Sequence, residues 1–170
     1  MYFNLKKKVG SLLVAAAMVT SIFAGLPVMA ADNIEVILTD VTNSNASTKT
    51  GDAKIQVSIK GNVDDVTAMQ TAFDVTGELD YIGVKYLMEN DAPADAKLGN
   101  KLTVGFALND AVSFTDETPV FILTFHKPTG GSVTLSVDNE HSYCLTENGS
   151  VYATGTSGIT AQAAESAKEG

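Results

Sequence analysis

Apolar and polar residues alternate in almost every hydrophobic segment between residues 33 and 153, and this pattern limits the possible folds most strongly. The clearest segments are NIEVIL, AKIQVSI, TAMQTAFDV, KLTVGFAL and SVTLSV, whereas the VFILTF run is apolar on both faces, as expected for a strand in the middle of a sandwich or one with a face covered by a loop. A period of two residues sends successive side chains to opposite faces of a β-strand. No window has the period of an amphipathic helix. The sequence therefore predicts an all-β fold, an antiparallel two-sheet β-sandwich of the nine-stranded jelly-roll kind.

Turn signals separate the predicted strands. They lie in TDVTNSNASTKTGD, KGNVDD and PTGG, and an Asn-Gly pair within YCLTENGSVYAT predicts a hairpin. MENDAPADAKLGN contains a proline and several charges, so we expect a long polar loop there. The alternation also predicts a core, formed by Ile55, Val57, Ile59, Met69, Phe73, Leu123 and Phe125.

Both ends of the chain have a composition that differs from the strand-rich part. Residues 6–8 are lysines, an apolar run follows over residues 9–26, and PVMA comes next. These are the parts of a secretory signal peptide covering residues 1–30, with cleavage after Ala30, whereas the run is of marginal length for a membrane anchor. The last segment has no apolar face, so we expect a sandwich over 31–153 and a flexible tail over 154–170.

The charge of the chain excludes several classes of partner. The net charge is −9, and three of the eleven lysines lie in the predicted signal, so residues 31–170 carry about −12. This part has no arginine and no tryptophan. Nucleic acids and anionic membrane surfaces attract cationic patches, so we expect neither as a partner once the signal is removed. The composition fits a secreted, extracellular protein.

The chain has few candidates for catalytic or metal-binding residues. Cys144 is the single cysteine, which excludes an internal disulfide and favours a small buried side chain. His141 lies three residues away, on the opposite face of an extended strand, so a Cys-His nucleophile is not favoured. Adjacent acids such as Asp64-Asp65 are typical of solvated turns, and the oxygen-rich loops lack the EF-hand pattern. We therefore expect no enzyme activity, no metal and no cofactor.

Four segments follow one another in an order that resembles a known family: GDAKIQVSI, AMQTAFDVTGELDYIGV, KLTVGFALND and PVFILTFHKPTGGSVTLSV. In this order they resemble bacterial cohesin domains. The matching positions are Gly51-Asp52, Val57, Ile59, Phe73-Asp74, Leu79-Asp80, Leu123, Phe125, Gly130-Gly131, Thr134 and Leu135. The resemblance covers residues 34–153 and needs a one-residue insertion near residues 76–77, which a β-bulge would absorb.

The resemblance implies a function. Cohesins are not enzymes; they bind the dockerin modules of secreted glycosidases and assemble cellulosome-like complexes for polysaccharide degradation. The family binds its partner on one flat sheet face that includes the strands matching residues 67–75 and 101–109. A partner helix lying on a sheet needs a face without bulky side chains, and the outer row of the first strand would supply Val66, Ala68, Gln70 and Ala72. Known cohesins tend to have polar residues at the positions of Val66 and Ala68, so we expect more apolar contact here.

The strand KLTVGFALND has two possible orientations. Simple alternation buries Leu102, Val104, Phe106 and Leu108 and leaves Gly105 outside. The resemblance favours the opposite orientation, with Val104, Phe106 and Leu108 on the partner-binding face. We predict this second orientation, in which Phe106 and Leu108 anchor a dockerin helix while Gln70 and Asn109 donate or accept hydrogen bonds at the rim.

Two further functions remain open. A carbohydrate-binding module of the same fold would present a planar row of aromatic rings to a polysaccharide, and Tyr81, Tyr86, Tyr143 and Tyr152 are available for this. A purely structural extracellular module would need no binding site at all.

Overall fold

The computed structural model describes residues 32–166, so the predicted signal peptide and its cleavage after Ala30 lie outside the described residues. Within this range the chain forms ten strands and one turn of 3-10 helix, η1 (Asn139–His141). The strands are β1 (Asn33–Asp40), β2 (Asp52–Gly77), β3 (Asp80–Tyr86), β4 (Asn90–Leu98), β5 (Lys101–Phe114), β6 (Thr118–His126), β7 (Ser132–Val137), β8 (Tyr143–Thr146), β9 (Gly149–Tyr152) and β10 (Gly158–Gln162). The predicted all-β antiparallel class is confirmed, with one strand more than the nine expected.

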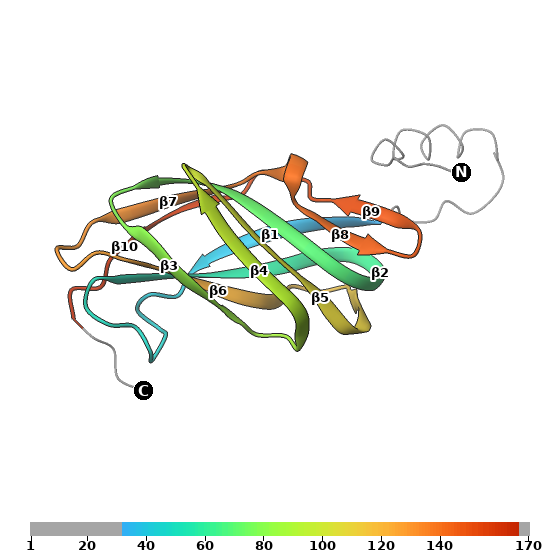
Figure 1. Cartoon of the computed structure of the whole chain (residues 1–170), viewed down its shortest axis with the longest axis horizontal. Helices are drawn as coiled ribbons and strands as arrows, with labels where there is room; N and C mark the ends of the chain where they lie inside the picture. Colours follow the sequence, from blue (N-terminus) through green and yellow to red (C-terminus); the bar gives the residue numbers. More distant parts are fainter. Residues whose placement is uncertain (1–31, 167–170) are drawn as a thin grey trace.

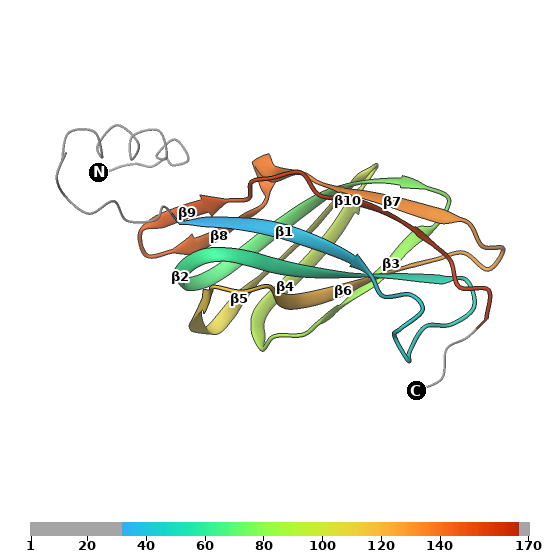
Figure 2. The ribbon, with the colours of Figure 1, turned by 180° about the vertical axis from the view of Figure 1, so that it is seen from behind.

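Two sheets share the long strand β2, and every pairing between strands is antiparallel. The first half of β2 pairs with β1 and β6, and β6 pairs with β3. Its second half pairs with β5 on one edge and with β7 and β8 in series on the other. Strands β4, β9 and β10 complete this second sheet. Figure 1 shows β7 and β10 at one end of the molecule and β8 and β9 at the other, and Figure 2 shows β1 beside β2 on the far side.

Strand β2 passes from one sheet to the other over residues 61–66, where the sequence predicted a turn. Asp65 has a φ of 55°, and the register with β5 shifts on either side of Val66. Such a bulge changes which side chains face the core, because it adds a residue to one strand of the pair. Val63, Val66 and Met69 are all buried, at a spacing of three residues. The prediction that Val66 lies in the outer row of the flat face is therefore wrong.

The space between the sheets is filled by apolar side chains. All seven predicted core residues are buried: Ile55, Val57, Ile59, Met69, Phe73, Leu123 and Phe125. The largest fully buried side chains of this core include four phenylalanines: Phe73, Phe114, Phe121 and Phe125. The ring of Phe73 packs edge-on against Phe121, with 6.5 Å between centroids. The alternation of the sequence is thus the alternation of core and surface.

Two segments that were predicted to be irregular are strands. Residues 90–98 form β4 at the edge of the second sheet, with Pro93 in the register shift between Asp91 and Ala94. Residues 158–162 form β10, which pairs with β7, whereas the sequence predicted a flexible tail from residue 154. Both strands lie at sheet edges, where backbone hydrogen bonds to one neighbour suffice and a continuous apolar face is not needed. Ala161 and Ala164 are buried, so small side chains close this end of the sandwich.

We expect Phe73→Ala to lower the free energy of unfolding by about 3–5 kcal/mol, because a fully buried ring leaves a cavity. Chemical denaturation would measure this change. Thr76→Ala, on the exposed side of the same strand, serves as the control and should change stability by less than about 0.5 kcal/mol. A loss below about 1 kcal/mol for Phe73→Ala would contradict the described core.

Candidate functional site

The outer surface of the second sheet contains a patch of small side chains, which we call the flat face. The register of β2 with β5 pairs Ala68 with Ala107 and Gln70 with Gly105, and β4 pairs Ala94 with Gly105. Opposed residues of an antiparallel pair point to the same side of the sheet. The flat face consists of Ala68, Gln70, Ala94, Ala96, Thr103, Gly105 and Ala107. It spans three neighbouring strands and carries no charged side chain.

Larger side chains border the flat face on two sides. Leu98 pairs with Lys101 at the β4 edge and is 79% exposed, while Leu145 pairs with Ala68 on β8 and is 38% exposed. Tyr143 pairs with Gln70, and its ring packs on Tyr152 of β9 with centroids 5.3 Å apart. The face is therefore a shallow, mostly apolar area between exposed leucines, which is the kind of patch that marks an interaction surface.

A group of polar contacts holds η1 and β8 against this sheet. Asp138 accepts a hydrogen bond from Lys101 Nζ at 2.6 Å and lies 2.8 Å from His141 Nδ1. Lys101 also pairs with Asp74 at 2.8 Å. Ser142 Oγ accepts a hydrogen bond from the Ala72 amide at 2.9 Å and donates one to the Asp138 carbonyl. These contacts connect β2 and β5 to the η1 turn at one end of the flat face.

The same contacts shift the pKa values of Asp138 and Lys101. Partial burial acts to raise the pKa of Asp138, but hydrogen bonds from Lys101 and His141 outweigh it and hold the pKa below its ordinary value. Hydrogen bonds to Asp138 and then Asp74 raise the pKa of Lys101. The pair is therefore charged throughout the neutral range.

Gln70 is already used by this arrangement. Its side-chain Nε2 donates a hydrogen bond to the His141 carbonyl at 3.0 Å, which leaves the side-chain oxygen for other contacts. Ala72 belongs to the same row of β2 but is buried, because the residues of η1 and Ser142 cover it. The predicted row is thus reduced at both ends, since Val66 is in the core and Ala72 is covered.

The predicted orientation of β5 is wrong. Met69 pairs with Phe106 and Thr71 with Val104, and both pairs face the core, so Val104 and Phe106 are buried. The ring of Phe106 packs edge-on against Tyr86 with centroids 5.3 Å apart. Leu108 is half-buried and packs against the core, whereas Asn109 is exposed. Pairing with β2 decides the orientation, because a strand cannot reverse its faces without breaking that register.

The flat face includes residues that the sequence interpretation missed. Ala94 and Ala96 lie on β4, within the segment that was expected to be a polar loop. Ala92, Ala94 and Ala96 alternate with other residues in DAPADAK, and this was the signal that could have found the strand. Thr103, Gly105 and Ala107 are the outward-facing residues of β5, whereas the prediction had placed them towards the core.

The other candidate residues have structural roles. Cys144 is buried opposite Met69, and burial raises the pKa of its thiol to about 12. Tyr81 donates a hydrogen bond to Asp95 at 2.7 Å and packs against Phe125, and Tyr86 packs against Phe106 and Phe121. Within residues 32–166, no group of acidic, histidine and cysteine side chains is arranged to hold a metal ion. No helix in this part is long and apolar enough to cross a membrane.

Several solved structures share this architecture, and three of these are cohesin modules. A non-cellulosomal cohesin from the archaeon Archaeoglobus fulgidus has a TM-score of 0.52 at 19% identity, covering 75% of this chain and 90% of its own. The cohesin module of a family 33 glycoside hydrolase from Clostridium perfringens has a TM-score of 0.57 at 9% identity, covering 76% and 96%. The domain has the cohesin fold.

A third structure with the cohesin fold comes from a type I cohesin–dockerin complex of Clostridium thermocellum. It has a TM-score of 0.53 at 9% identity and covers 79% of this chain and 97% of its own. No protein-family model matches the sequence, and no curated protein matches it either. The likeness therefore lies in the fold, which the resemblance of the four sequence segments had predicted.

The contacts of Asp138 lead to a prediction on pH. Because the pKa of Asp138 is lowered in the folded state, its stabilising contribution is present above about pH 4 and is lost as the pH falls through the folded-state value. We expect wild type to be more stable than Lys101→Gln at about pH 6 by less than about 1 kcal/mol, and this difference to shrink towards about pH 3.

Thermal unfolding of both proteins across this pH range would measure the difference. Lys97→Gln is the matched control, because Lys97 contacts a backbone carbonyl and no carboxylate. A stability difference between wild type and Lys101→Gln that stayed constant as the pH fell would show that the ion pair does not stabilise the fold.

Proposed function

We propose that this domain is a non-catalytic cohesin-type module that binds dockerin modules of secreted glycosidases through the flat face. The observation that carries the proposal is the uncharged surface of small side chains on β2, β5 and β4 of a cohesin fold. These include the strands that the family resemblance assigned to partner binding. A similar fold in Clostridium thermocellum is one half of a cohesin–dockerin complex, which supports the same role here.

The shape of the flat face suits a helix laid across the sheet. Alanine and glycine keep the three strands free of protruding side chains, so a partner backbone can approach closely. Leu98 and Leu145 are exposed on opposite sides of this area and would contact the apolar face of such a helix. Buried apolar anchors contribute most of the free energy at interfaces of this kind, and the surrounding polar groups contribute less.

The chemistry of the rim defines what the partner must offer. Asp74 and Asp91 are exposed beside the face, and Lys101 is already paired with two carboxylates. The side-chain oxygen of Gln70 and the amide of Asn109 supply the uncharged polar groups. A partner with small or apolar residues at the centre and cationic or amide groups at its margin fits this surface.

Polysaccharide binding is less well supported. The tyrosine rings at the surface of the second sheet are those of Tyr143 and Tyr152, and their planes are inclined by 51° to each other. Two tilted rings do not form the planar platform on which sugar rings stack. Tyr81 and Tyr86 pack against core phenylalanines instead.

The proposal includes an extracellular location. The basic and apolar residues at positions 6–26 read as a secretory signal, and an assembly with secreted glycosidases requires export. Expression of the full chain in a secreting bacterium, followed by N-terminal sequencing of the exported protein, would test cleavage after Ala30.

A bulky cation in the flat face should abolish partner binding. We expect Ala107→Arg, or Ala94→Arg on the neighbouring strand, to weaken binding to a dockerin module by about 100-fold or more, because a long side chain prevents close approach of the helix. The partner would be chosen from a panel of purified dockerin modules of the same organism, and isothermal titration calorimetry would measure affinity.

Thr39→Arg is the matched control, since it adds the same charge at an exposed position of β1 in the other sheet. It should bind like wild type, and all three variants should melt within a few degrees of wild type. If Ala107→Arg binds as tightly as Thr39→Arg, the flat face is not the binding surface. If no dockerin module in the panel binds wild type, the proposed function fails.

A further inference from the structure

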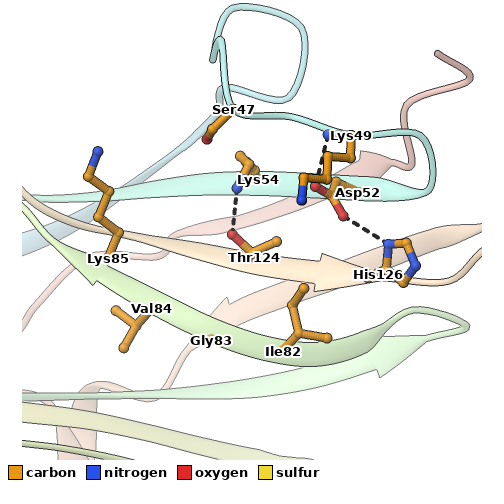
Figure 3. A pocket seen from close by; sticks show the side chains of 10 residues that line it. All are labelled: Ser47, Lys49, Asp52, Lys54, Ile82, Gly83, Val84, Lys85, Thr124 and His126. Carbon is orange, nitrogen blue, oxygen red and sulfur yellow. Dashed lines mark hydrogen bonds and ion pairs between the residues drawn. The ribbon is translucent and has the colours of Figure 1, made fainter. Parts of the chain in front are cut away.

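The outer surface of the first sheet contains a groove of about 510 Å³ that lies on the opposite side of the sandwich from the flat face. Figure 3 shows Ser47 and Lys49 along one side of it, Ile82 and Val84 along the other, and Lys54 with Thr124 between them. Lys54 lies between the core residues Ala53 and Ile55, which confirms that it faces away from the core. Nothing in the proposed partner binding uses this surface.

Positive charge is concentrated in the groove, although the whole chain carries −9. Three of the seven lysines in residues 32–166 line it, namely Lys49, Lys54 and Lys85, together with His126. Asp52 is the one acidic residue of the lining. In the described part of the chain, no carboxylate lies within ion-pair distance of these three ammonium groups.

The carboxylate of Asp52 is already occupied. One oxygen lies 2.8 Å from His126 Nδ1, and the other accepts a hydrogen bond from the Lys49 backbone amide at 2.9 Å. These contacts position the loop that precedes β2 and the end of β6. Asp52 therefore does not serve as the direct counter-ion of a lysine in the groove.

Lys54 is the central cation. It is only 9% exposed, and its ammonium donates one hydrogen bond, to Thr124 Oγ1 at 2.9 Å. An ammonium has three donors, so the others are available to a ligand. The pKa of Lys54 is lowered, mainly because the ammonium is partly buried. Asp52 acts in the opposite direction, and the positive charges of Lys85 and Lys49 lower the pKa further. A partly desolvated cation with cationic neighbours and no bonded carboxylate is unfavourable unless an anion joins it.

The remaining lining is open and includes one exposed aliphatic side chain, that of Ile82. Thr124 pairs with Lys54 on one side and with Gly83 on the other, and a side chain at Gly83 would meet nothing within 4 Å. Ile82, in the register shift of β3, is 59% exposed. The lining includes no aromatic ring on which a sugar could stack. Carboxylates alternating with aliphatic side chains, as in an extended acidic peptide, match both parts of this surface.

We propose that this groove is a second binding site, which takes an extended acidic peptide segment of another protein. Its carboxylates contact the ammonium groups of Lys54 and Lys85, and its aliphatic side chains lie on Ile82. The site is independent of the flat face because the two surfaces belong to different sheets. It would let the module hold a second protein while a dockerin occupies the first.

The test uses the folded protein and a capped peptide of three alternating Asp-Val pairs, titrated by calorimetry in low salt. We expect the double variant Lys54→Met/Lys85→Gln to bind at least about tenfold more weakly than wild type, because two charge-assisted contacts are lost. Lys60→Gln/Lys97→Gln removes the same charge away from the groove and should bind like wild type. Binding should also weaken as salt is added, since the contacts are ionic.

Four further results would support or overturn the proposal. Lys54→Met alone should melt at or above the wild-type temperature, because it removes a poorly paired buried charge; a large loss of stability would mean that Lys54 serves the fold. Equal binding of a peptide with Asn in place of Asp would overturn the acidic preference. Binding of trigalacturonate or inorganic phosphate in place of the peptide would overturn the peptide assignment, as would no binding of the peptide at millimolar concentration. The peptide test does not depend on dockerin binding, so the groove proposal can hold even if no dockerin module binds the flat face.

Discussion

The pairing of β2 with its neighbours determines the rest of this structure. Its first half carries β1 and β6, and its second half carries β5, β7 and β8, so both sheets depend on one strand. The bulge around Val66 changes which side chains face inward between the halves. From Ala68 onward, the register with β5 places Met69 and Phe106 together in the core and Ala68 and Ala107 together outside. Core and flat face are two sides of the same pairing.

The two outer surfaces of the sandwich differ in chemistry because their strands supply different outward residues. At the centre of the second sheet these are mainly alanine, glycine and threonine, which leave the flat face low and uncharged, with Asp74, Asp91 and Lys101 at its margin. On the first sheet they include Lys54 and Lys85, with Gly83 leaving a hollow between strands. A thin sandwich can therefore present one surface for a broad apolar contact and another for an anionic ligand, without either site disturbing the other.

The candidate site was predictable only in part, and the reasons are physical. The small outer residues of TAMQTAFDV predicted a flat outer surface, and Ala68 and Gln70 do lie on the flat face. Ala72 was assigned correctly to the outer row but is covered by Ser142, from a segment about 70 residues later in the chain. The orientation of β5 was predicted wrongly because both of its side-chain sets are compatible with alternation, and only the register with Met69 and Thr71 distinguishes them. The alanines of β4 were missed because proline and charged residues masked a two-residue period.

The sequence by itself determined the fold class, the strand-rich domain and seven buried core residues, because side-chain alternation is a local property of an extended chain. It also carried the resemblance to cohesins, whose fold the solved structures share. Tertiary structure alone decided which side of β5 faces the solvent, where β2 changes sheets, and which lysines line the groove. These features depend on contacts between residues far apart in the chain, such as Lys54 with Thr124 and Gln70 with His141. No local pattern encodes such contacts, because register and long-range pairing are set by the packing of the whole domain.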